Sequence, residues 1–578
     1  MKIMPNRPYL NRTVDDTIAM YKPHVSGTEG AVSCNNPYAA EAALRIMKQG
    51  GNAFDAACAV ALTLGVVEPY HSGIGGGCFH VFYDKKEDDF GCTDARGVAP
   101  KNAYQDMMLD EAGEVDLNLT EFSGRSVATP ALYRAMDQLL KKHGTMTWAE
   151  VSAPAIQFAR EGFYCGFTYA RVSDTPEAEH NQAEYEGFKE LYLKDGKPHE
   201  YGDLIKNPDL ANTMEQVAEH GVDWFYNGPI ADEIVKYVNE NKGVFTKEDL
   251  VECAPKTRTP VRGTYRGYDI ISMAPPSSGG THIIQMLNIL ENFDLAGMGF
   301  HSADSVHVIA ETMKLMFADR SIAMGDPDFV EIKLDKLLSK EYAKELAAKI
   351  DMKAAKEYAP SEGIEAKEYR GCTANFTIMD KFGNVFSQTQ TIRNWWGSGV
   401  VIPGRGFIMN NAMADFSAKA GVRTTQGLAY GMANAIRPGK TPLSSMCPSM
   451  VFKDGKPFLS LGAAGGPRII TSNLQTILGC IDYGQMVDSS LKHPHMCCLT
   501  KGQGLELEEG FSPDTIKLLE ERGHLIKPTG DFGILLVMPN GIRNIDGTLF
   551  PGGTNRVDGG GGALTASGAM AIDGLCFL

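Results

Sequence analysis

Apolar positions near the start of the chain predict two consecutive helices. The stretch NPYAAEAALRIMKQGGNAFDAACAVALTLGVVEP (36–69) has alanine-rich segments on both sides of Gly50-Gly51. The glycines are expected to end the first helix, and Asn52 can cap the second. Because the second segment is apolar on nearly every side, we expect it to be buried.

Further along the chain the pattern changes from strands to helices and back. GIGGGCFHVFYDKKEDDFGCTDAR (73–96) has an apolar run and a polar turn, which predict a β-hairpin. Residues from about 130 to 350 are mostly helical in pattern, interrupted by a strand pair at 258–280 that includes a Pro/Ser/Gly loop. Strands return after Thr373. Strand pairs at both ends with helices between them indicate sheets covered by helices.

One strand begins abruptly. GCTANFTIMDKFGN (371–384) reads as one half of a hairpin, with β-branched and apolar residues followed by a polar turn. It follows a long Lys/Glu/Ala-rich segment that we expect to be helical, and the small polar Thr373 stands at its head. Taken alone, the segment favours an ordinary hairpin threonine.

Composition and charge exclude several classes of protein. Of the 578 residues 43% are hydrophobic and 22% charged, as in ordinary globular proteins. The net charge of −16 leaves no basic surplus to neutralise phosphates, so we expect no nucleic-acid partner. No window of eighteen apolar residues occurs, so we expect no membrane span.

The cysteines indicate a reducing compartment. The twelve cysteines are scattered and form no C-x-x-C pair, which favours free thiols inside the cell. The first residues, MKIMPNRPYLNRTVDDTIAMYK, have no continuous apolar run of a secretory signal. We therefore expect a cytoplasmic protein from the sequence as given, with a periplasmic or secreted location as the alternative.

The common catalytic motifs are missing. The chain has no G-x-S-x-G elbow, H-E-x-x-H or Walker loop. GIGGGCF (73–79) is better read as a tight turn than as a dinucleotide loop, and the HPH at 493–495 as a loop rather than a metal site. We expect no metal and no organic cofactor.

Two turns remain as candidates for binding an anion. GAAGGPR (462–468) places the amides of Gly465 and Gly466 between a predicted strand and a predicted helix, where they suit an anion or an oxyanion. PLSSMCP (442–448) places two serines in a turn between prolines. The alternative for each is a purely structural turn.

Taken together, long stretches of the chain resemble the γ-glutamyltranspeptidase (glutathione hydrolase) family of N-terminal nucleophile hydrolases. The resemblance runs from about Gly30 to Val557 and keeps the order of the motifs. It is carried by GGNAFDAACAVALTLGVVEP, SGIGGGCF, PPSSGGTHIIQMLNILENFD, FADRSIAMGDPDF, MNNAMADFSAKAG, PLSSMCP and FSPDTIKLLEERG. It implies an α+β fold, a four-layer αββα sandwich with a helical portion in the large subunit.

The resemblance implies that the chain cuts itself before a threonine. The matching bond joins Cys372 to Thr373, so residues 1–372 become a large subunit and residues 373–578 a small one, as one intertwined heterodimer. The freed amine, with a pKa near ~8, can accept the proton of the Thr373 hydroxyl. Thr391 matches the threonine that hydrogen-bonds the nucleophile, and Gly465 and Gly466 match the oxyanion hole.

Four further residues match the site for the donor's amino-acid end. Arg96 matches the arginine that binds the α-carboxylate, a natural fork-to-carboxylate pairing. Ser444 and Ser445 match serines at the same carboxylate. Asp415 matches the acid that pairs with the α-ammonium group.

Several positions depart from the family pattern. Arg393 stands where many members have Asn, and Ala412 where they have Gln or Glu; both family residues help to hold the donor. We expect Arg393 to lie in the substrate site, where it can reach a second anion. Asn375 replaces a frequent His, and Gln426 stands near the usual position of a lid tyrosine.

The expected reaction is attack on a γ-glutamyl amide such as glutathione, giving a γ-glutamyl-threonine ester that water or an amino-acid or peptide acceptor resolves. A first alternative keeps the nucleophile and changes the acyl group, as in relatives that cleave glutaryl (cephalosporin), oxamate or poly-γ-glutamate amides. A second is an uncleaved homologue that only binds ligands. Thr373, Thr391 and the Gly465-Gly466 pair argue against that second alternative.

Overall fold

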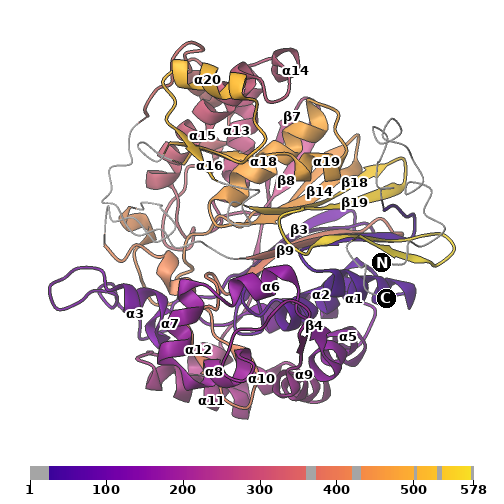
Figure 1. The fold of residues 1–578 in the computed structure, drawn as a ribbon, viewed down its shortest axis with the longest axis vertical. Helices are drawn as coiled ribbons and strands as arrows, with labels where there is room; N and C mark the ends of the chain where they lie inside the picture. The colour runs from indigo at the N-terminus through magenta and orange to yellow at the C-terminus, as the bar shows by residue number, and fades with distance from the viewer. Residues whose placement is uncertain (1–24, 359–372, 420–430, 500–503, 530–536, 574–578) are drawn as a thin grey trace.

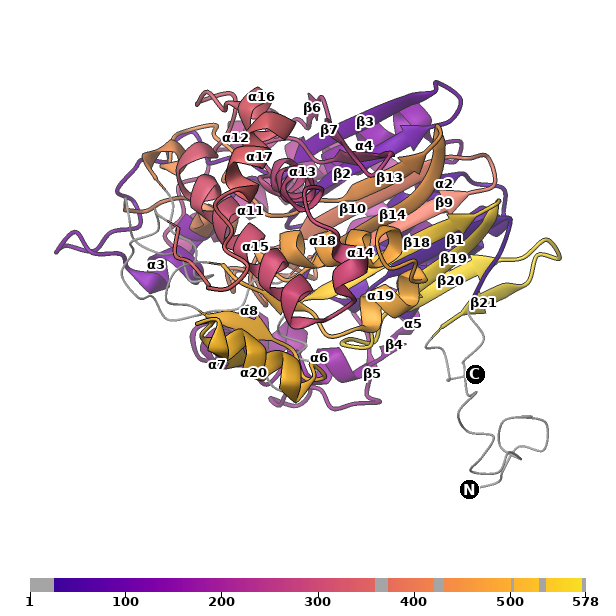
Figure 2. The same ribbon diagram turned by 90° about the horizontal axis from the view of Figure 1, so that it is seen from above.

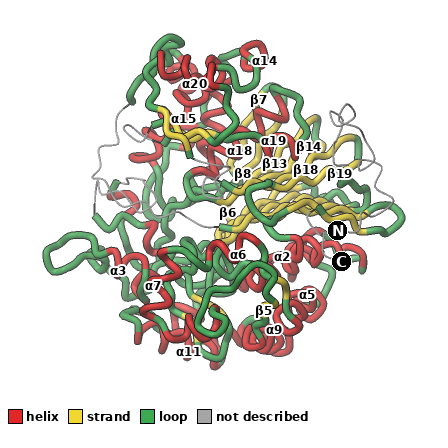
Figure 3. Tube along the Cα trace, in the orientation of Figure 1, coloured by secondary structure: helices red, strands yellow, loops and turns green. Residues whose placement is uncertain are grey.

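The computed structural model describes residues 25–358, 373–419, 431–499, 504–529 and 537–573. Two stacked antiparallel sheets lie between two layers of helices (Figures 1 and 3). At the centre of the larger sheet is a hairpin of β9 (Ala374–Asp380) and β10 (Val385–Thr391). This is the hairpin predicted from the stretch that starts at Thr373.

The larger sheet has eight strands in the order β21-β20-β1-β9-β10-β2-β3-β6. Its other strands are β1 (Gly30–Cys34), β2 (Gly77–Asp84), β3 (Asp89–Ala95), β6 (Lys256–Arg258), β20 (Gly560–Leu564) and β21 (Met570–Ile572). β9 pairs with β1 on one side, and β10 pairs with β2 on the other. Strands from the end of the chain therefore alternate with strands from its beginning (Figure 2).

The smaller sheet has six strands in the order β19-β18-β14-β13-β8-β7. They are β7 (Val261–Tyr265), β8 (Tyr268–Ser272), β13 (Ser449–Lys453), β14 (Lys456–Ala464), β18 (Met538–Ile545) and β19 (Thr548–Gly553). Polar side chains join the two sheets where β14 crosses the central hairpin. Ser387 Oγ donates to Leu461 O over 3.0 Å, and a Cβ at Gly462 would stand only 2.1 Å from Asn375 Nδ2.

Helices α1 (Pro37–Lys48) and α2 (Ala53–Val67) cover the outer face of the larger sheet. As predicted, α1 ends before Gly50, and Asn52 caps α2 in a box with Asp55. Every residue of α2 is buried, because the helix is apolar all round and packs between the sheet and other helices.

The outer face of the smaller sheet is covered by α13 (Gly279–Leu290), α18 (Arg468–Ile481) and α19 (Val487–Lys492). The predicted αββα architecture is thereby confirmed. The remaining α-helices are α3 (Leu117–Glu121), α4 (Leu132–His143), α5 (Trp148–Glu161), α6 (Phe167–Val172), α7 (Pro176–Glu184), α8 (Glu186–Tyr192), α9 (Pro208–His220), α10 (Asp223–Asn227), α11 (Pro229–Glu240), α12 (Lys247–Val251), α14 (Leu295–Met298), α15 (Ala303–Ala323), α16 (Leu334–Leu337), α17 (Lys340–Ala347) and α20 (Pro513–Glu521).

Shorter elements complete the fold. The 3₁₀ turns are η3 (Gly124–Ser126), η4 (Ala412–Asp415) and η5 (Met432–Asn434). The small strand groups are β4 (Phe163–Tyr164) with β5 (Leu204–Ile205), β11 (Val401–Ile402) with β12 (Phe407–Ile408), and β15 (Met496–Cys497), β16 (Leu505–Leu507) and β17 (Ile526–Pro528).

The expectation of a long helix before Thr373 is wrong for its described part. α17 ends at Ala347, and residues 348–358 are not helical. The physical reason lies in tertiary contacts: the Lys356 amide donates to Glu311 Oε2 over 3.1 Å, and the Ala355 amide to Arg522 O over 2.7 Å. These contacts take the backbone donors away from a helical ladder. The remainder of that segment lies outside the described residues.

The sequence also led us to expect free thiols and no membrane-spanning helix. Within the described ranges, the ten cysteines are all buried and none forms a disulfide. None of the helices described is both long enough and apolar enough to cross a bilayer.

Candidate active site

The central hairpin brings the predicted nucleophile beside its predicted partner. Thr373 stands directly before β9, and Thr391 is the last residue of β10. Both are buried, and Thr373 Oγ1 donates to Thr391 Oγ1 over 3.4 Å. In the intact chain the nitrogen of Thr373 is an amide, so it becomes a base only after the bond to Cys372 is cut. Cys372 itself lies outside the described residues.

A single small cavity unites nearly all the residues predicted for the site. It is lined by Arg96, Thr373, Thr391, Arg393, Asp415, Leu443, Ser444, Ser445, Met446, Gly466 and Ile469. Gly465 is not part of this lining but precedes Gly466 in the same turn. Residues from both halves of the chain therefore meet around the Thr373 hydroxyl.

The two glycines form the turn that links β14 to α18. Gly465 has φ +133° and Gly466 φ +60°, which only glycine adopts readily. The carbonyls of both residues accept hydrogen bonds from Arg468 and Ile469 at the start of the helix. Their amides thus lie where a strand ends and a helix begins, the geometry that suits a developing negative charge.

The two serines are held by a second loop that follows β8. The amide and the hydroxyl of Ser278 each donate to Ser444 O over 2.8 Å. Arg320 of α15 donates to Ser445 Oγ over 3.0 Å and to Ser278 Oγ over 2.8 Å. Because Arg320 supplies the donor, the Ser445 hydroxyl proton is free to point at another acceptor. The sequence showed FADRS as a family stretch but gave no sign of this role for Arg320.

Asp415 lies between two arginines. Arg96 Nη2 contacts one carboxylate oxygen, Oδ2, and Arg393 Nε donates to the other, Oδ1, over 2.8 Å. All three side chains are buried. Arg96, which directly follows β3, is therefore held inside the site rather than exposed to solvent. Asp415, which was expected to meet the substrate ammonium, here pairs with both arginines, one at each carboxylate oxygen.

Glu121 completes this ion network, although no motif in the sequence marks it. It ends α3 and is fully buried. Arg393 Nη1 contacts its Oε2, which also accepts from Asn394 Nδ2 over 2.7 Å and from Asn411 Nδ2 over 3.2 Å. Burial alone would lower the pKa of Arg393, but the carboxylates of Glu121 and Asp415 outweigh it and raise that pKa above its usual value.

Arg393 also acts through its backbone. Its φ of +83° is unusual for a residue with a side chain. In this conformation its amide donates to Thr391 Oγ1 over 2.8 Å. Arg393 thus links the threonine beside the nucleophile to the charged end of the cavity.

Two other residues that depart from the family pattern, Ala412 and Asn375, make contacts that stabilise the fold. Ala412 is buried in a small apolar cluster with Met107, Met413 and Phe416. Asn375 Nδ2 donates to Gln388 O over 2.8 Å and to Thr389 Oγ1 over 3.0 Å, so its side chain ties the hairpin together where β14 approaches it. Gln426 lies outside the described residues.

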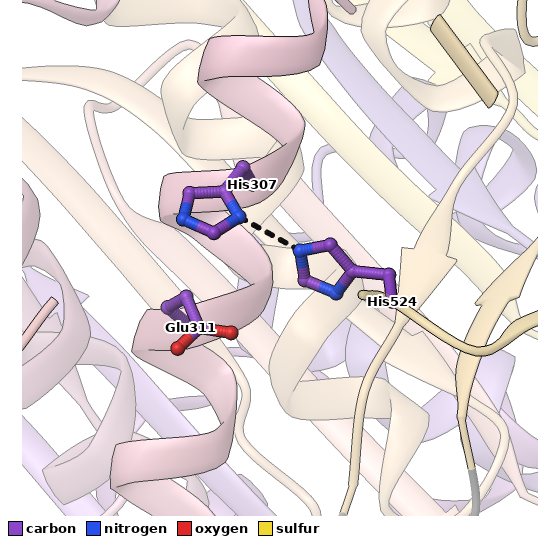
Figure 4. A group of neighbouring side chains, drawn as sticks. All are labelled: His307, Glu311 and His524. Carbon is purple, nitrogen blue, oxygen red and sulfur yellow. Dashed lines mark hydrogen bonds between the residues drawn. The ribbon is translucent and has the colours of Figure 1, made fainter. Parts of the chain in front are cut away.

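A histidine pair away from the cavity resembles a metal site, but its atoms bind one another (Figure 4). His307 Nε2 is 2.8 Å from Asp351 O, so it carries the proton. His307 Nδ1 then accepts from His524 Nε2 over 2.8 Å. Glu311 accepts from the Tyr358 hydroxyl over 2.8 Å and pairs with Lys314. Burial lowers the pKa of both histidines, that of His524 to about 3. The HPH turn does not form part of this group.

Comparison with known proteins shows the family. The family model described as gamma-glutamyltranspeptidase matches residues 39–556. The chain belongs to the gamma-glutamyltranspeptidase family. This agrees with the resemblance found in the sequence.

Relatives of this gamma-glutamyltranspeptidase family member carry different names. The glutathione hydrolase proenzyme of Escherichia coli (strain K12) is 40% identical over 524 residues, covering 89% of this chain and 90% of that protein. The acylase ACY 1 proenzyme of Pseudomonas sp. (strain SE83) is 35% identical over 99% of this chain and 100% of that one.

A solved structure is similar over nearly the whole fold. The crystal structure of cephalosporin acylase from Bacillus halodurans superposes with a TM-score of 0.83 at 28% identity, covering 97% of this chain and 99% of that one. The protein is therefore an enzyme of the N-terminal nucleophile hydrolase type within the gamma-glutamyltranspeptidase family. Membership alone leaves two classes of acyl donor, γ-glutamyl and other acyl amides.

Proposed function

We propose that the protein is a self-processing γ-glutamyl transferase and hydrolase that uses Thr373 as its nucleophile. The observation that carries the proposal is the single cavity in which Thr373 and Thr391 face Arg96, Asp415 and the serine pair. A hydroxyl nucleophile, an amide-lined turn and a carboxylate-binding arginine are the parts that cleavage of a γ-glutamyl amide requires.

Maturation would use the same hydroxyl as catalysis. Thr373 Oγ1 attacks the carbonyl carbon of Cys372, the C–N bond breaks, and the nitrogen takes up the hydroxyl proton. Water then hydrolyses the resulting ester, which leaves Cys372 as a carboxylate and Thr373 with a free α-amine. Residues 1–372 and 373–578 would remain together as the two subunits.

Turnover would repeat this chemistry on a donor amide. The α-amine, with a pKa near ~8, accepts the proton of Oγ1 as the oxygen attacks. The amides of Gly465 and Gly466 would stabilise the oxyanion, and Thr391 would orient the nucleophile. The leaving amine departs with a proton, and water or the amine of an amino acid or peptide resolves the ester. No step needs a metal or an organic cofactor.

The donor's amino-acid end would lie at the charged end of the cavity. Arg96, assisted by Ser444 and Ser445, would take the α-carboxylate, and Asp415 would take the α-ammonium. This requires the donor to loosen the contact between Arg96 and Asp415. The net charge of the site does not change, because the donor's amino-acid end is a zwitterion. The ion pair between Arg96 and Asp415 would be replaced by two: Arg96 with the α-carboxylate and Asp415 with the α-ammonium.

A second candidate donor is an acyl group with a carboxylate but no amine, such as glutaryl. It is favoured by one observation: both oxygens of Asp415 are engaged by arginines. An ammonium group placed there competes with two guanidinium groups. The similarity to an acylase proenzyme and to a cephalosporin acylase is consistent with this candidate.

The deciding experiment compares donors on the matured enzyme. Purified protein is first run on a denaturing gel, where two bands support self-cleavage and one full-length band supports a non-catalytic binding protein. The kcat/KM values for γ-glutamyl, glutaryl and oxamate amides are then measured side by side. We expect γ-glutamyl to be preferred; a preference for glutaryl would replace the proposed function with the acylase alternative.

A further inference from the structure

We infer that Glu121 is a specificity-determining residue that acts through Arg393 to keep Asp415 available for the donor's ammonium group. This rests on the proposed function. Glu121 does not line the cavity and would not touch the donor, so it is a positioning residue. Its position on α3, far from the hairpin in sequence, explains why no motif revealed it.

The Arg393 guanidinium contacts two carboxylates at once. Nη1 contacts Glu121, Nε donates to Asp415 Oδ1 over 2.8 Å, and Nη2 lies 3.3 Å from Ala414 O. The planar guanidinium therefore lies between two carboxylates: that of Asp415 at the cavity and that of Glu121 behind it. Whichever carboxylate attracts it more strongly determines how tightly Arg393 binds Asp415.

The Glu121 carboxylate is itself held in place. Asn394 and Asn411 donate to its carboxylate from two other directions, and Asn411 Nδ2 also bonds to its backbone oxygen over 3.0 Å. Glu121 therefore cannot follow Arg393 toward the cavity. A carboxylate fixed behind the arginine therefore competes with Asp415 for the guanidinium and weakens the hold of Arg393 on Asp415.

The charges of this ion network balance. Arg96 and Arg393 contribute two positive charges, and Glu121 and Asp415 two negative charges, all in a buried region. Arginine does not lose its proton in proteins, so the network cannot relieve an imbalance by neutralising Arg393. Without the Glu121 charge, one excess positive charge remains beside Asp415. Such a site repels an ammonium group and attracts a donor that brings only a carboxylate.

The test is Glu121→Gln, which keeps the shape and one acceptor oxygen but removes the charge. On the matured enzyme, kcat/KM is measured for γ-glutamyl and for glutaryl p-nitroanilide, and the ratio of the two is compared with native. We expect the ratio to fall by about tenfold or more, mainly through a higher KM for the γ-glutamyl donor. If Glu121 had a purely structural role, its substitution would reduce the amount of active enzyme. Such a loss lowers kcat/KM for both donors equally and leaves their ratio unchanged.

Two variants serve as controls. Glu121→Asp keeps the charge and should hold the ratio within about threefold of native. Glu508→Gln removes the carboxylate from another fully buried pair, with Arg556, whose two residues do not line the cavity. Its ratio should be unchanged, even if the protein is less stable.

The outcomes separate this inference from the proposed function. A folded Glu121→Gln enzyme with a ratio within about twofold of native overturns the inference and leaves the function standing. Should that variant not fold, Glu121→Gln/Arg393→Gln removes both charges; a ratio at or above native supports the inference, and a lower ratio overturns it. A native enzyme that cleaves neither donor overturns both.

Discussion

At the scale of single residues, Arg393 connects two parts of the site that have different tasks. Its amide donates to the Thr391 hydroxyl, and its side chain binds Asp415 and Glu121. A left-handed backbone at a non-glycine residue persists only when its surroundings enforce it. Here the contacts to Thr391, Asp415 and Glu121 do so. A substitution at the donor pocket can therefore also change the position of the nucleophile's partner Thr391, because Arg393 contacts both. The effects of single substitutions around the cavity should be compared with those of double substitutions.

Thr373→Ala removes the hydroxyl that both cuts the chain and attacks the donor. We expect one full-length band on a denaturing gel and no amidase activity. In the native protein, N-terminal sequencing of the small subunit should give Thr-Ala-Asn-Phe. A small subunit that begins at any other residue would refute the assignment of Thr373.

Arg96→Lys replaces a planar fork by a point charge beside Asp415. We expect the KM for the γ-glutamyl donor to rise strongly, with a smaller change in kcat, because the lost interaction binds the ground state and the transition state alike. Initial rates over a range of donor concentrations measure both constants. An unchanged KM for every tested donor would remove Arg96 from the donor site.

Arg393→Asn restores the residue that many family members have, but it leaves Glu121 without its arginine. We expect two effects: a wider margin for γ-glutamyl over glutaryl donors, and a loss of about 3–5 kcal/mol in the free energy of unfolding from the broken buried pair. Donor kinetics and urea unfolding measure them separately. Adding Glu121→Gln should recover part of the stability, and failure to do so would show that the pair is not the cause.

At the scale of elements, local patterns predicted most of what the structure contains. The two Ala-rich helices, the hairpin at 73–96 and the strand that begins after Thr373 follow from apolar periodicity and turn residues. Local pattern could not predict where residues distant in sequence meet. Glu121 lies in a helix that carries no family motif, and Arg320 lies in a family stretch that gave no sign of its role; only tertiary packing brings the two to the site. The helix expected before Thr373 is absent from the described residues for the same reason: Glu311 of α15 accepts from the Lys356 amide, and the backbone oxygen of Arg522, just after α20, accepts from the Ala355 amide.

The contact between α15 and the segment after α20 should make stability depend on pH. His307 and His524 have lower pKa values in the folded protein than in the unfolded chain, where histidine titrates near 6.5. Below about pH 6.5 the unfolded chain therefore binds more protons at these two histidines, so their contribution to the free energy of unfolding falls as the pH drops and does not change above that range.

His524→Asn tests this dependence. The urea midpoints at about pH 5 and about pH 7.5 should differ less in the variant than in the native protein. The variant lacks one histidine that is neutral in the folded protein and takes up a proton on unfolding at low pH. His220→Asn, at an exposed position at the end of α9, is the matched control and should leave the difference as it is. An undiminished pH difference in His524→Asn would contradict the prediction.

At the scale of the whole molecule, strands from both proposed subunits alternate in the larger sheet. The pair β9–β10 lies between β1 and β2, and β20 lies on the far side of β1. The smaller sheet likewise joins β7 and β8 to four strands from after Thr373. The family resemblance implied an intertwined fold, and the strand order shows how the two parts interlock.

This strand order predicts different refolding behaviour before and after cleavage. Thr373→Ala protein, a single chain, should refold from urea at a rate independent of protein concentration. Mature protein must reassemble two fragments, so its refolding rate and yield should depend on concentration. Activity or fluorescence recovery at several dilutions distinguishes the two cases. Equal concentration dependence in both would argue against the proposed cleavage.

The alternation of strands also bears on how long a mature molecule survives. If the fragment that carries β9, β10 and β20 leaves, β1 loses both of its partners and β2 loses one, so both strands present open backbone edges to water. Such edges recruit other chains. Subunits that dissociate would then aggregate faster than they reassociate. The useful lifetime of the enzyme would be set by how slowly the central hairpin is released, a rate, rather than by the equilibrium between folded and unfolded forms.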